Sequence, residues 1–359
     1  MALISPPPRK VRDTNLELFR IVLMLAIIMH HYVVNSGLFP MLLNTREELN
    51  SRLLLFLGAW GKTGINCFVL ITGYFMCKSQ ISVEKFLKLF LEVIFYLLVF
   101  NTVFFLSGYV PLSLGNLFRG FIGGDISHSF WKTYLVFFLC IPFWNILISN
   151  LSKRHHLLFL FLLLGWFSIL PSLNGRFNVV FNYVSWFGVV YLLGAYIRLY
   201  SENLFKTCWL WGIISVVLIG FGCLSIIYYP DVYFFVSDSN KLLAVAISVA
   251  LFLFFKNLSL PCIPAVYWFS QTIFGVLLIH ANSDFMRKWL WVDVLKNTSM
   301  LSSPWLWIHV LGSVIGIFVI CSYLDHLRIR FVEKQFMVIL SKFEKKYCGT
   351  SFLKQRVNE

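Results

Sequence analysis

An arginine and a histidine lie within the first long apolar run of the chain, LELFRIVLMLAIIMHHYV from Leu16 to Val33. Arg20 carries a fixed positive charge, and the imidazole of His31 takes up and releases protons near neutral pH. Ionisable groups inside a membrane-spanning helix are costly, and they usually line a cavity or a substrate route. A structural alternative stays open, in which Arg20 reaches the lipid headgroups and His31 bonds to a backbone carbonyl of a neighbouring helix.

Helical geometry brings these two side chains onto one face. They are eleven residues apart. This spacing is about three turns of 3.6 residues, so their directions differ by only roughly 20° and the rise separates them by about 16 Å. His30 points about 100° away from His31 and is not expected on that face. Glu17 precedes Arg20 by three residues and can pair with it along the helix.

The composition identifies the class of chain that must position these residues. Of the 359 residues, 59% are hydrophobic and 13% are charged, against about a quarter charged in soluble domains. The mean hydropathy is +0.78. No soluble fold buries that much apolar surface, so the sequence predicts an integral membrane protein. The eight cysteines are scattered without CxxC or metal spacing, so we expect neither a disulfide framework nor a metal site.

The apolar runs predict an all-α bundle of about ten transmembrane helices, since each span needs about 20 mostly apolar residues. The expected spans are residues 16–37, 55–77, 86–109, 131–150, 156–172, 180–200, 208–229, 241–256, 267–283 and 305–325. The fifth and eighth are short, and Gly58, Gly61 and Lys62 interrupt the second near its start. We expect residues 1–327 to form the membrane domain and residues 328–359 to form a basic cytoplasmic tail on anionic lipid.

The net charge of +14 is interpreted as a topology signal. Cations concentrate in alternate loops and in the tail, at Arg9, Lys10, Arg12, Lys78, Lys85, Lys88, Lys153, Arg154, Arg198, Lys206, Arg328, Arg330, Lys334, Lys342, Lys345, Lys346, Lys354 and Arg356. The opposite loops are poorer in cations and balanced by acidic residues. Because positively charged loops face the cytoplasm, we expect both termini there, in a multi-pass protein of the cell (cytoplasmic or inner) membrane.

Several motifs follow one another in a recognisable order. Arg20 and His31 are separated by ten residues, and GKTGINCFVLITGYF follows from Gly61 to Phe75, with Thr72 near its end. WKTYLVFFLCIPFWN, YLLGAYIRLY and SQTIFGVLLIH come later. Together they resemble the integral-membrane acyltransferase-3 family, which includes O-antigen, exopolysaccharide and Nod-factor acyltransferases. The first pair repeats the family's Arg-x10-His pattern, and Thr72 replaces its usual serine.

The chain departs from this family at the start of the third helix. Relatives often carry paired arginines there, whereas this chain has Lys85 and Lys88 in VEKFLKLF. Lysine meets a phosphate as a point charge, without the bidentate fork of arginine. Members of the family take their acyl group from acyl-CoA, and which residue would hold the phosphates of this donor is therefore left open. Some relatives carry an additional extracytoplasmic hydrolase-like domain. We expect none here, so the chemistry is expected within the membrane domain.

The resemblance implies an O-acyltransferase that moves an acyl group, commonly acetyl, from cytoplasmic acyl-CoA to a hydroxyl of a surface glycan or its lipid-linked precursor. An alcohol needs a base to become a good nucleophile, and His31 is the expected general base. Arg20 is expected to hold a phosphate or the pantetheine arm, or to shape the pocket, while Lys85 and Lys88 attract the nucleotide end. Membrane lipids are expected partners, and nucleic acid is not. The acceptor, the acyl length and the choice between direct transfer and an acyl-enzyme intermediate stay open.

Three polar residues on the later spans have two interpretations each, and a fourth is expected to form an ion pair. Thr72 either contacts the donor or permits close helix approach. His280 either binds acceptor hydroxyls or packs at the interface, and Trp131 is either an interfacial anchor or a stacking surface for substrate. Glu92 is expected to form a structural ion pair with Arg20 or a lysine.

Two other classes of protein compete with the enzyme. A transporter or flippase of lipid-linked sugars or small metabolites would use the same polar face as an alternating-access route, but such proteins show matched glycine- or proline-broken spans in their two halves. Pro142 has no such counterpart. A purely structural membrane protein gives no reason for the alignment of Arg20 with His31. The chain contains no GxSxG, Walker-type or HExxH motif.

Overall fold

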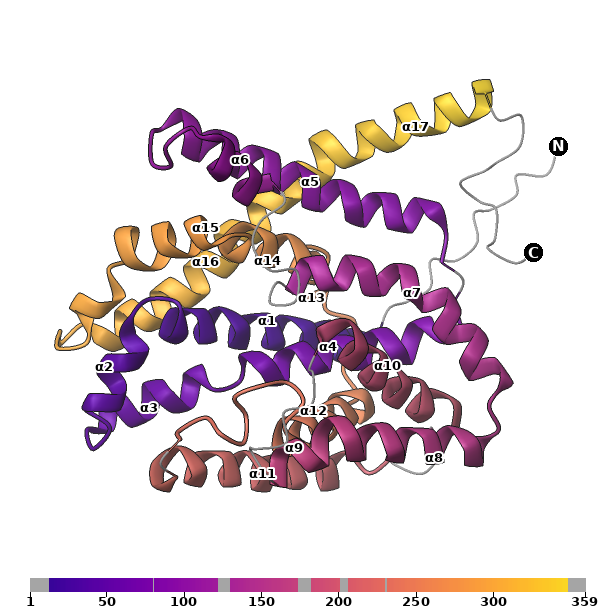
Figure 1. Ribbon diagram of the computed structural model, residues 1–359, viewed down its shortest axis with the longest axis horizontal. Coiled ribbons are helices and arrows are strands. Elements are labelled where there is room, and N and C mark those ends of the chain that lie inside the picture. Colours follow the sequence, from indigo (N-terminus) through magenta and orange to yellow (C-terminus); the bar gives the residue numbers. More distant parts are fainter. Residues whose placement is uncertain are drawn as a thin grey trace.

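The computed structural model describes residues 13–79, 81–121, 130–173, 182–200, 206–229 and 231–347. Within these ranges the chain forms helices joined by turns and loops (Figure 1). The long helices are α1 (Thr14–Val34), α4 (Gly61–Met76), α5 (Val83–Leu106), α7 (Phe130–Asn150), α8 (Lys153–Leu164), α10 (Tyr183–Tyr200), α11 (Cys208–Tyr228), α12 (Leu242–Asn257), α16 (Leu306–Arg328) and α17 (Lys334–Tyr347). The shorter ones are α2 (Leu38–Asn44), α3 (Leu49–Gly58), α6 (Leu114–Phe121), η2 (Gly165–Ile169), α9 (Leu170–Leu173), α13 (Pro264–Ser270), α14 (Ile273–Ala281), α15 (Asp284–Lys288), η3 (Trp289–Val294), η4 (Asn297–Met300) and η5 (Ile329–Glu333).

The all-helical fold is confirmed for the described residues, and it contains several helices of the kind that crosses a membrane. Seven helices are long and apolar enough to span a bilayer, and the bent pair α13–α14 would make an eighth. The expected number of ten is not confirmed, because α12 has only 16 residues and α10, with 18, is not among the candidate spans. Five of the predicted topology cations lie outside the described residues: Arg9, Lys10, Arg12, Lys354 and Arg356.

Helix α1 runs through the middle of the bundle, where it contacts α3, α4, α12, α13, α14 and α16 (Figure 1). Its apolar side chains therefore face other helices, and Phe19, Ile28 and Tyr32 are almost fully buried. Helix α11 lies at the edge instead and exposes Val216 and Phe221, as a lipid-facing surface requires. The contrast explains why α1 tolerates Glu17, Arg20, His30 and His31: that helix faces protein on most sides.

The expected second span is divided into α3 and α4 by a break at Ala59 and Trp60, next to the glycines that interrupt it in the sequence. A Cβ on Gly58 would lie 2.7 Å from Val33, and one on Gly61 would lie 2.3 Å from the ring of His30. The two glycines are thus required by the close passage of α1 beside the break.

Helices α4 and α10 also approach closely through glycine. A Cβ on Gly73 would lie 2.4 Å from the carbonyl oxygen of Tyr191, and one on Gly194 would lie 2.5 Å from that of Leu70. Small residues permit this separation of helix backbones in membrane proteins. Gly73, the residue after Thr72, thus provides the close helix approach that was one interpretation of the Thr72 position.

The helical part of the chain continues past residue 328, at which a cytoplasmic tail was expected to begin. Helix α16 extends through Arg328 and is followed directly by η5 and α17. The guanidinium of Arg328 is 4% exposed and forms ion pairs with Asp325 at 2.6 Å, Glu333 at 2.9 Å and Glu92 at 3.2 Å. Among the described residues, Glu92 therefore pairs with Arg328 of α16, and not with Arg20 or a lysine. The functional division of the chain at residue 328 stays a prediction.

Candidate active site

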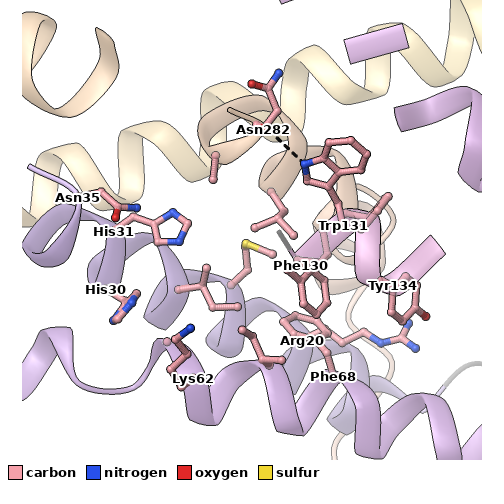
Figure 2. Close-up of a pocket in the computed structure, with 18 of the residues that line it drawn as sticks. Arg20, His30, His31, Asn35, Lys62, Phe68, Phe130, Trp131, Tyr134 and Asn282 are labelled. Atoms are coloured by element: carbon pink, nitrogen blue, oxygen red, sulfur yellow. Dashed lines mark hydrogen bonds between the residues drawn. The ribbon is translucent and has the colours of Figure 1, made fainter. Parts of the chain in front are cut away.

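A cavity of about 450 Å³ lies inside the bundle, bounded by α1, α4, α5, α7, α13, α14 and α15 (Figure 2). Both residues of the predicted pair line it, as do Thr72 and Trp131. Their side chains come from α1, α4 and α7, so folding assembles the site from distant parts of the chain. The remaining wall is mostly apolar and aromatic, including Phe68. A concave apolar site with a few convergent polar groups is the usual form of a small-molecule site.

A second hollow of about 660 Å³ adjoins the first. Its lining includes Lys85, Lys88 and Glu92, and it shares Arg20 and Tyr134 with the first cavity. The two predicted lysines thus lie at one hollow and His31 at the other, with Arg20 between them. Lys88 also pairs with Glu84 at 3.0 Å, so part of its charge is balanced locally.

Arg20 is held in place by its own helix. Its Nη1 donates to both carboxylate oxygens of Glu17, at 3.2 and 3.3 Å, which confirms the predicted pairing. Glu17 is buried, whereas the Arg20 side chain keeps 30% of its surface exposed. The carboxylate offsets part of the cost of placing this cation inside the bundle. The other donors of the guanidinium fork are directed toward the hollows that Arg20 lines.

His31 has a second histidine behind it. The rings of His31 and His280 have centroids 5.2 Å apart. Nδ1 of His31 and Nε2 of His280 are both buried, and neither has a hydrogen-bond partner among the described residues. Nδ1 of His280 bonds to the carbonyl oxygen of Val276 at 2.6 Å. Because a carbonyl only accepts, this nitrogen carries the proton, and in the neutral ring Nε2 is left as an acceptor.

His280 does not line the cavity. Its side chain is 0% exposed, so direct contact with an acceptor does not fit its position. The residue ends α14 as expected, but α14 packs against α16 and α1, and these helices cover the imidazole. Its neighbour in space, His31, is the one that reaches the cavity.

His30 lines the cavity as well, which the helical spacing did not predict. The cavity extends around more than one side of α1, so a residue turned by about 100° still reaches it. Nδ1 of His30 bonds to the carbonyl oxygen of Gly58 at 2.6 Å, at the end of α3. This contact gives His30 a packing role at the α3–α4 break that His31 lacks.

Trp131 and Thr72 are tied to neighbouring helices. Trp131 is 8% exposed and its indole nitrogen donates to the backbone carbonyl of Asn282 at 3.1 Å, across from α7 to the end of α14 (Figure 2). Thr72 donates to the carbonyl oxygen of Phe68 at 2.9 Å and lies 3.3 Å from the hydroxyl of Tyr134. Trp131 is therefore a wall of the cavity and not an exposed interfacial anchor.

Two cations that the sequence analysis did not select also line the cavity: Lys62 and Arg287. The ammonium of Lys62 donates to the hydroxyl of Tyr183 at 2.6 Å, and that hydroxyl donates to Asp238 at 2.9 Å. Arg287 pairs with Asp284 on α15. The sequence could have indicated Lys62 as a site residue, because it lies within an apolar run. It could not have indicated Arg287, which resembles an ordinary loop charge.

These observations define a multi-pass membrane protein with a polar-lined cavity inside its helical bundle. Comparison with family models adds the class of activity: the acyltransferase-3 family model, described as an acyltransferase domain, matches residues 13–326. The match covers most of the chain, and the chain belongs to this family of acyltransferases. No curated protein and no solved structure shows a significant match.

Proposed function

We propose that this protein is a membrane-embedded O-acyltransferase that moves an acyl group, in the simplest case acetyl, from acyl-CoA to a hydroxyl of a cell-surface polysaccharide or its lipid-linked precursor. The observation that supports this most is the pair of adjoining hollows, with His31 on the inner one, two lysines at the other, and Arg20 lining both. One hollow can hold the charged end of a donor while its thioester lies in the other.

The donor is proposed to enter by the hollow of Lys85 and Lys88. Three cations in or beside one path suit the phosphates of a nucleotide, and Arg20 can offer two parallel donors to a phosphate. The long pantetheine arm would then follow α1 toward His31, across a helical rise of about 16 Å. Thr72 and Tyr134 lie along the same wall and offer hydroxyls to the amides of that arm.

The chemical step is proposed to use His31 as the general base. Nε2 of its imidazole takes the proton of the acceptor hydroxyl, and the hydroxyl oxygen attacks the thioester carbonyl. Collapse of the tetrahedral intermediate breaks the carbon–sulfur bond, and the imidazolium returns the proton to the leaving thiolate. Atoms balance with one ester formed, one thioester broken and one free thiol released.

His280 is proposed as the residue that orients this base. A centroid separation of 5.2 Å leaves room for a hydrogen bond of about 3 Å between Nδ1 of His31 and Nε2 of His280. Such a bond would place the proton of neutral His31 on Nδ1 and the lone pair on Nε2. The bond made by one imidazole nitrogen decides which state the other is in.

The proposed topology places both termini in the cytoplasm, with ten passages through the cytoplasmic membrane. This orientation puts the hollow of Lys85 and Lys88 on the side where acyl-CoA is made. It follows from the positive charge of alternate loops. Trp131, across the cavity from α1, is proposed to form the surface against which the acceptor sugar rests.

The experiment that tests this function compares surface glycans from a strain that lacks the gene with those from strains complemented with wild type or His31→Ala at equal membrane levels. Mass spectrometry is expected to find acyl groups on a glycan only in the wild-type strain. Glycans with the same acylation in all strains would refute the proposed enzyme. Accumulation of an unmodified lipid-linked glycan inside the membrane would indicate the transporter instead.

A further inference from the structure

We propose that the acceptor is an anionic glycan unit, whose carboxylate or phosphate is bound by Lys62 and Arg287 at the outer end of the cavity. His30, Lys62 and Asn35 lie at the end of the cavity away from Arg20 (Figure 2), and we call this part, together with the lining residue Arg287, the outer end. This inference rests on the proposed acyl transfer and adds to it the charge of the sugar that receives the acyl group.

Lys62 is anchored in a way that keeps its charge at the cavity. It lies near the start of α4, and the hydroxyl of Tyr183 accepts one of its three possible hydrogen bonds. Tyr183 is itself buried and bonded to Asp238, so this carboxylate lies behind the phenol and also acts on the lysine electrostatically. The ammonium is thus fixed in position by a neutral contact, with further donors available for a ligand.

Arg287 faces the same space from α15. Its side chain is 34% exposed and lines the cavity, while its partner Asp284 is 90% exposed and does not line it. Both cations lie close enough to His31 to interact electrostatically with it. A ligand group held between them would therefore lie near the proposed base.

The charges of the lining are all of one sign. Three of the described lining residues carry a full charge, namely Arg20, Lys62 and Arg287, and no aspartate or glutamate is among them. A buried cation is costly unless an anion or hydrogen bonds compensate it.

The donor cannot account for the outer pair. Its phosphates are proposed to lie at Arg20, Lys85 and Lys88, and His31 is about 16 Å farther along α1. Lys62 and Arg287 stand at His31 and beyond, where only the acyl group and the acceptor come. An anionic acceptor adds a counter-charge inside the cavity, whereas with a neutral sugar the two cations keep only Asp284 and the Tyr183–Asp238 pair, which lie outside the lining.

The first part of the test identifies the charge of the acceptor. The smallest glycan fragment that carries a gene-dependent acyl group is isolated and sequenced by tandem mass spectrometry. We expect a fragment with a carboxylate or phosphate on the acylated sugar or its neighbour. A neutral fragment would overturn the inference and leave the acyltransferase intact, whereas the absence of any gene-dependent acyl group would remove both.

The second part uses purified full-length protein in lipid nanodiscs, with that fragment in its unacylated form and a copy whose acidic groups are methyl-esterified. Wild type is expected to acylate the acidic form about tenfold faster, the effect of one charge-assisted hydrogen bond. Lys62→Gln and Arg287→Gln should each lower the rate on the acidic fragment about tenfold, and so remove most of its advantage over the ester. Lys62→Arg should retain the preference.

Lys288→Gln is the matched control, because Lys288 is the exposed neighbour of Arg287 and does not line the cavity. It should behave as wild type on both forms. Equal losses on the acidic and esterified fragments in Lys62→Gln and Arg287→Gln would overturn the inference, since that result assigns the cations to the thioester or to folding. Thermal unfolding of each variant in nanodiscs separates these two causes.

Discussion

The imidazole rings of His31 and His280 lie 5.2 Å apart by their centroids, although they come from the first helix of the bundle and from α14. His280 is fixed by its bond to Val276, and one nitrogen of each ring is buried without a partner among the described residues. Of these two histidines, only His31 lines the cavity. We propose that His31 reacts and that His280 orients it.

The first prediction concerns this orientation. His280→Leu removes the acceptor for His31 Nδ1 and should lower kcat about 10- to 100-fold, the cost of one lost buried hydrogen bond. The KM for acetyl-CoA should stay near its wild-type value, because His280 does not contact the donor. His280→Gln keeps a side-chain acceptor and should recover part of the loss. Steady-state kinetics that show equal activity in all three proteins would exclude an orienting role.

The second prediction concerns the cation between the two hollows. Arg20→Gln removes the charge and should raise the KM for acetyl-CoA about tenfold or more, as expected for a charge-assisted contact to phosphate. Arg20→Lys keeps a point charge but not the fork, so an intermediate KM is expected. Isothermal titration with desulfo-CoA measures the same affinity without turnover. An unchanged affinity in Arg20→Gln would place the donor phosphates elsewhere.

The third prediction concerns Lys85 and Lys88. The double variant to glutamine should raise the KM for acetyl-CoA only severalfold at low salt, and the difference should shrink as salt screens exposed charges over a Debye length of about 10 Å. Lys153→Gln is the control, because Lys153 is exposed on α8 and lines neither hollow. A loss that does not depend on salt would argue against long-range attraction of the donor.

The fourth prediction concerns the close contact of α4 with α10. Gly73→Ala puts a Cβ 2.4 Å from a backbone oxygen, which should destabilise the fold by about 1–3 kcal/mol, as overpacking does. Gly312→Ala, where a Cβ meets nothing within 4 Å, should be neutral or stabilising because alanine favours helices. Thermal unfolding in detergent compares the two. Similar Tm values for both variants would contradict the close approach.

Helix α1 and the pairing of Glu17 with Arg20 could be predicted from the sequence because both depend on local geometry. The spacing of Glu17, Arg20 and His31 along one helix decides which side chains share a face, and no other part of the chain is needed. The apolar runs likewise predict the long helices. The pair α13–α14, which is bent by 44°, and the short α12 depend on packing between helices, so whether each counts as a span could not be predicted from the sequence.

The rest of the site depends on tertiary packing. His280 could be placed at the end of a span, but its position behind His31 follows from the packing of α14 on α1. Lys62 and Arg287 are far apart in the chain, and only the fold brings them to one cavity. Glu92 illustrates the same limit, since its partner Arg328 lies at the other end of the sequence.

The measurement that tests the central claim most directly is the transfer of label from radioactive acetyl-CoA in inside-out membrane vesicles that contain the full-length protein and the native glycan. Wild type is expected to place label on the glycan, and His31→Ala at an equal membrane level should reduce the rate by about 10²–10⁴-fold, the range for loss of a general base. Arg20 and Glu17 remain in this variant, so donor binding should persist. Equal labelling by His31→Ala and wild type would contradict the account.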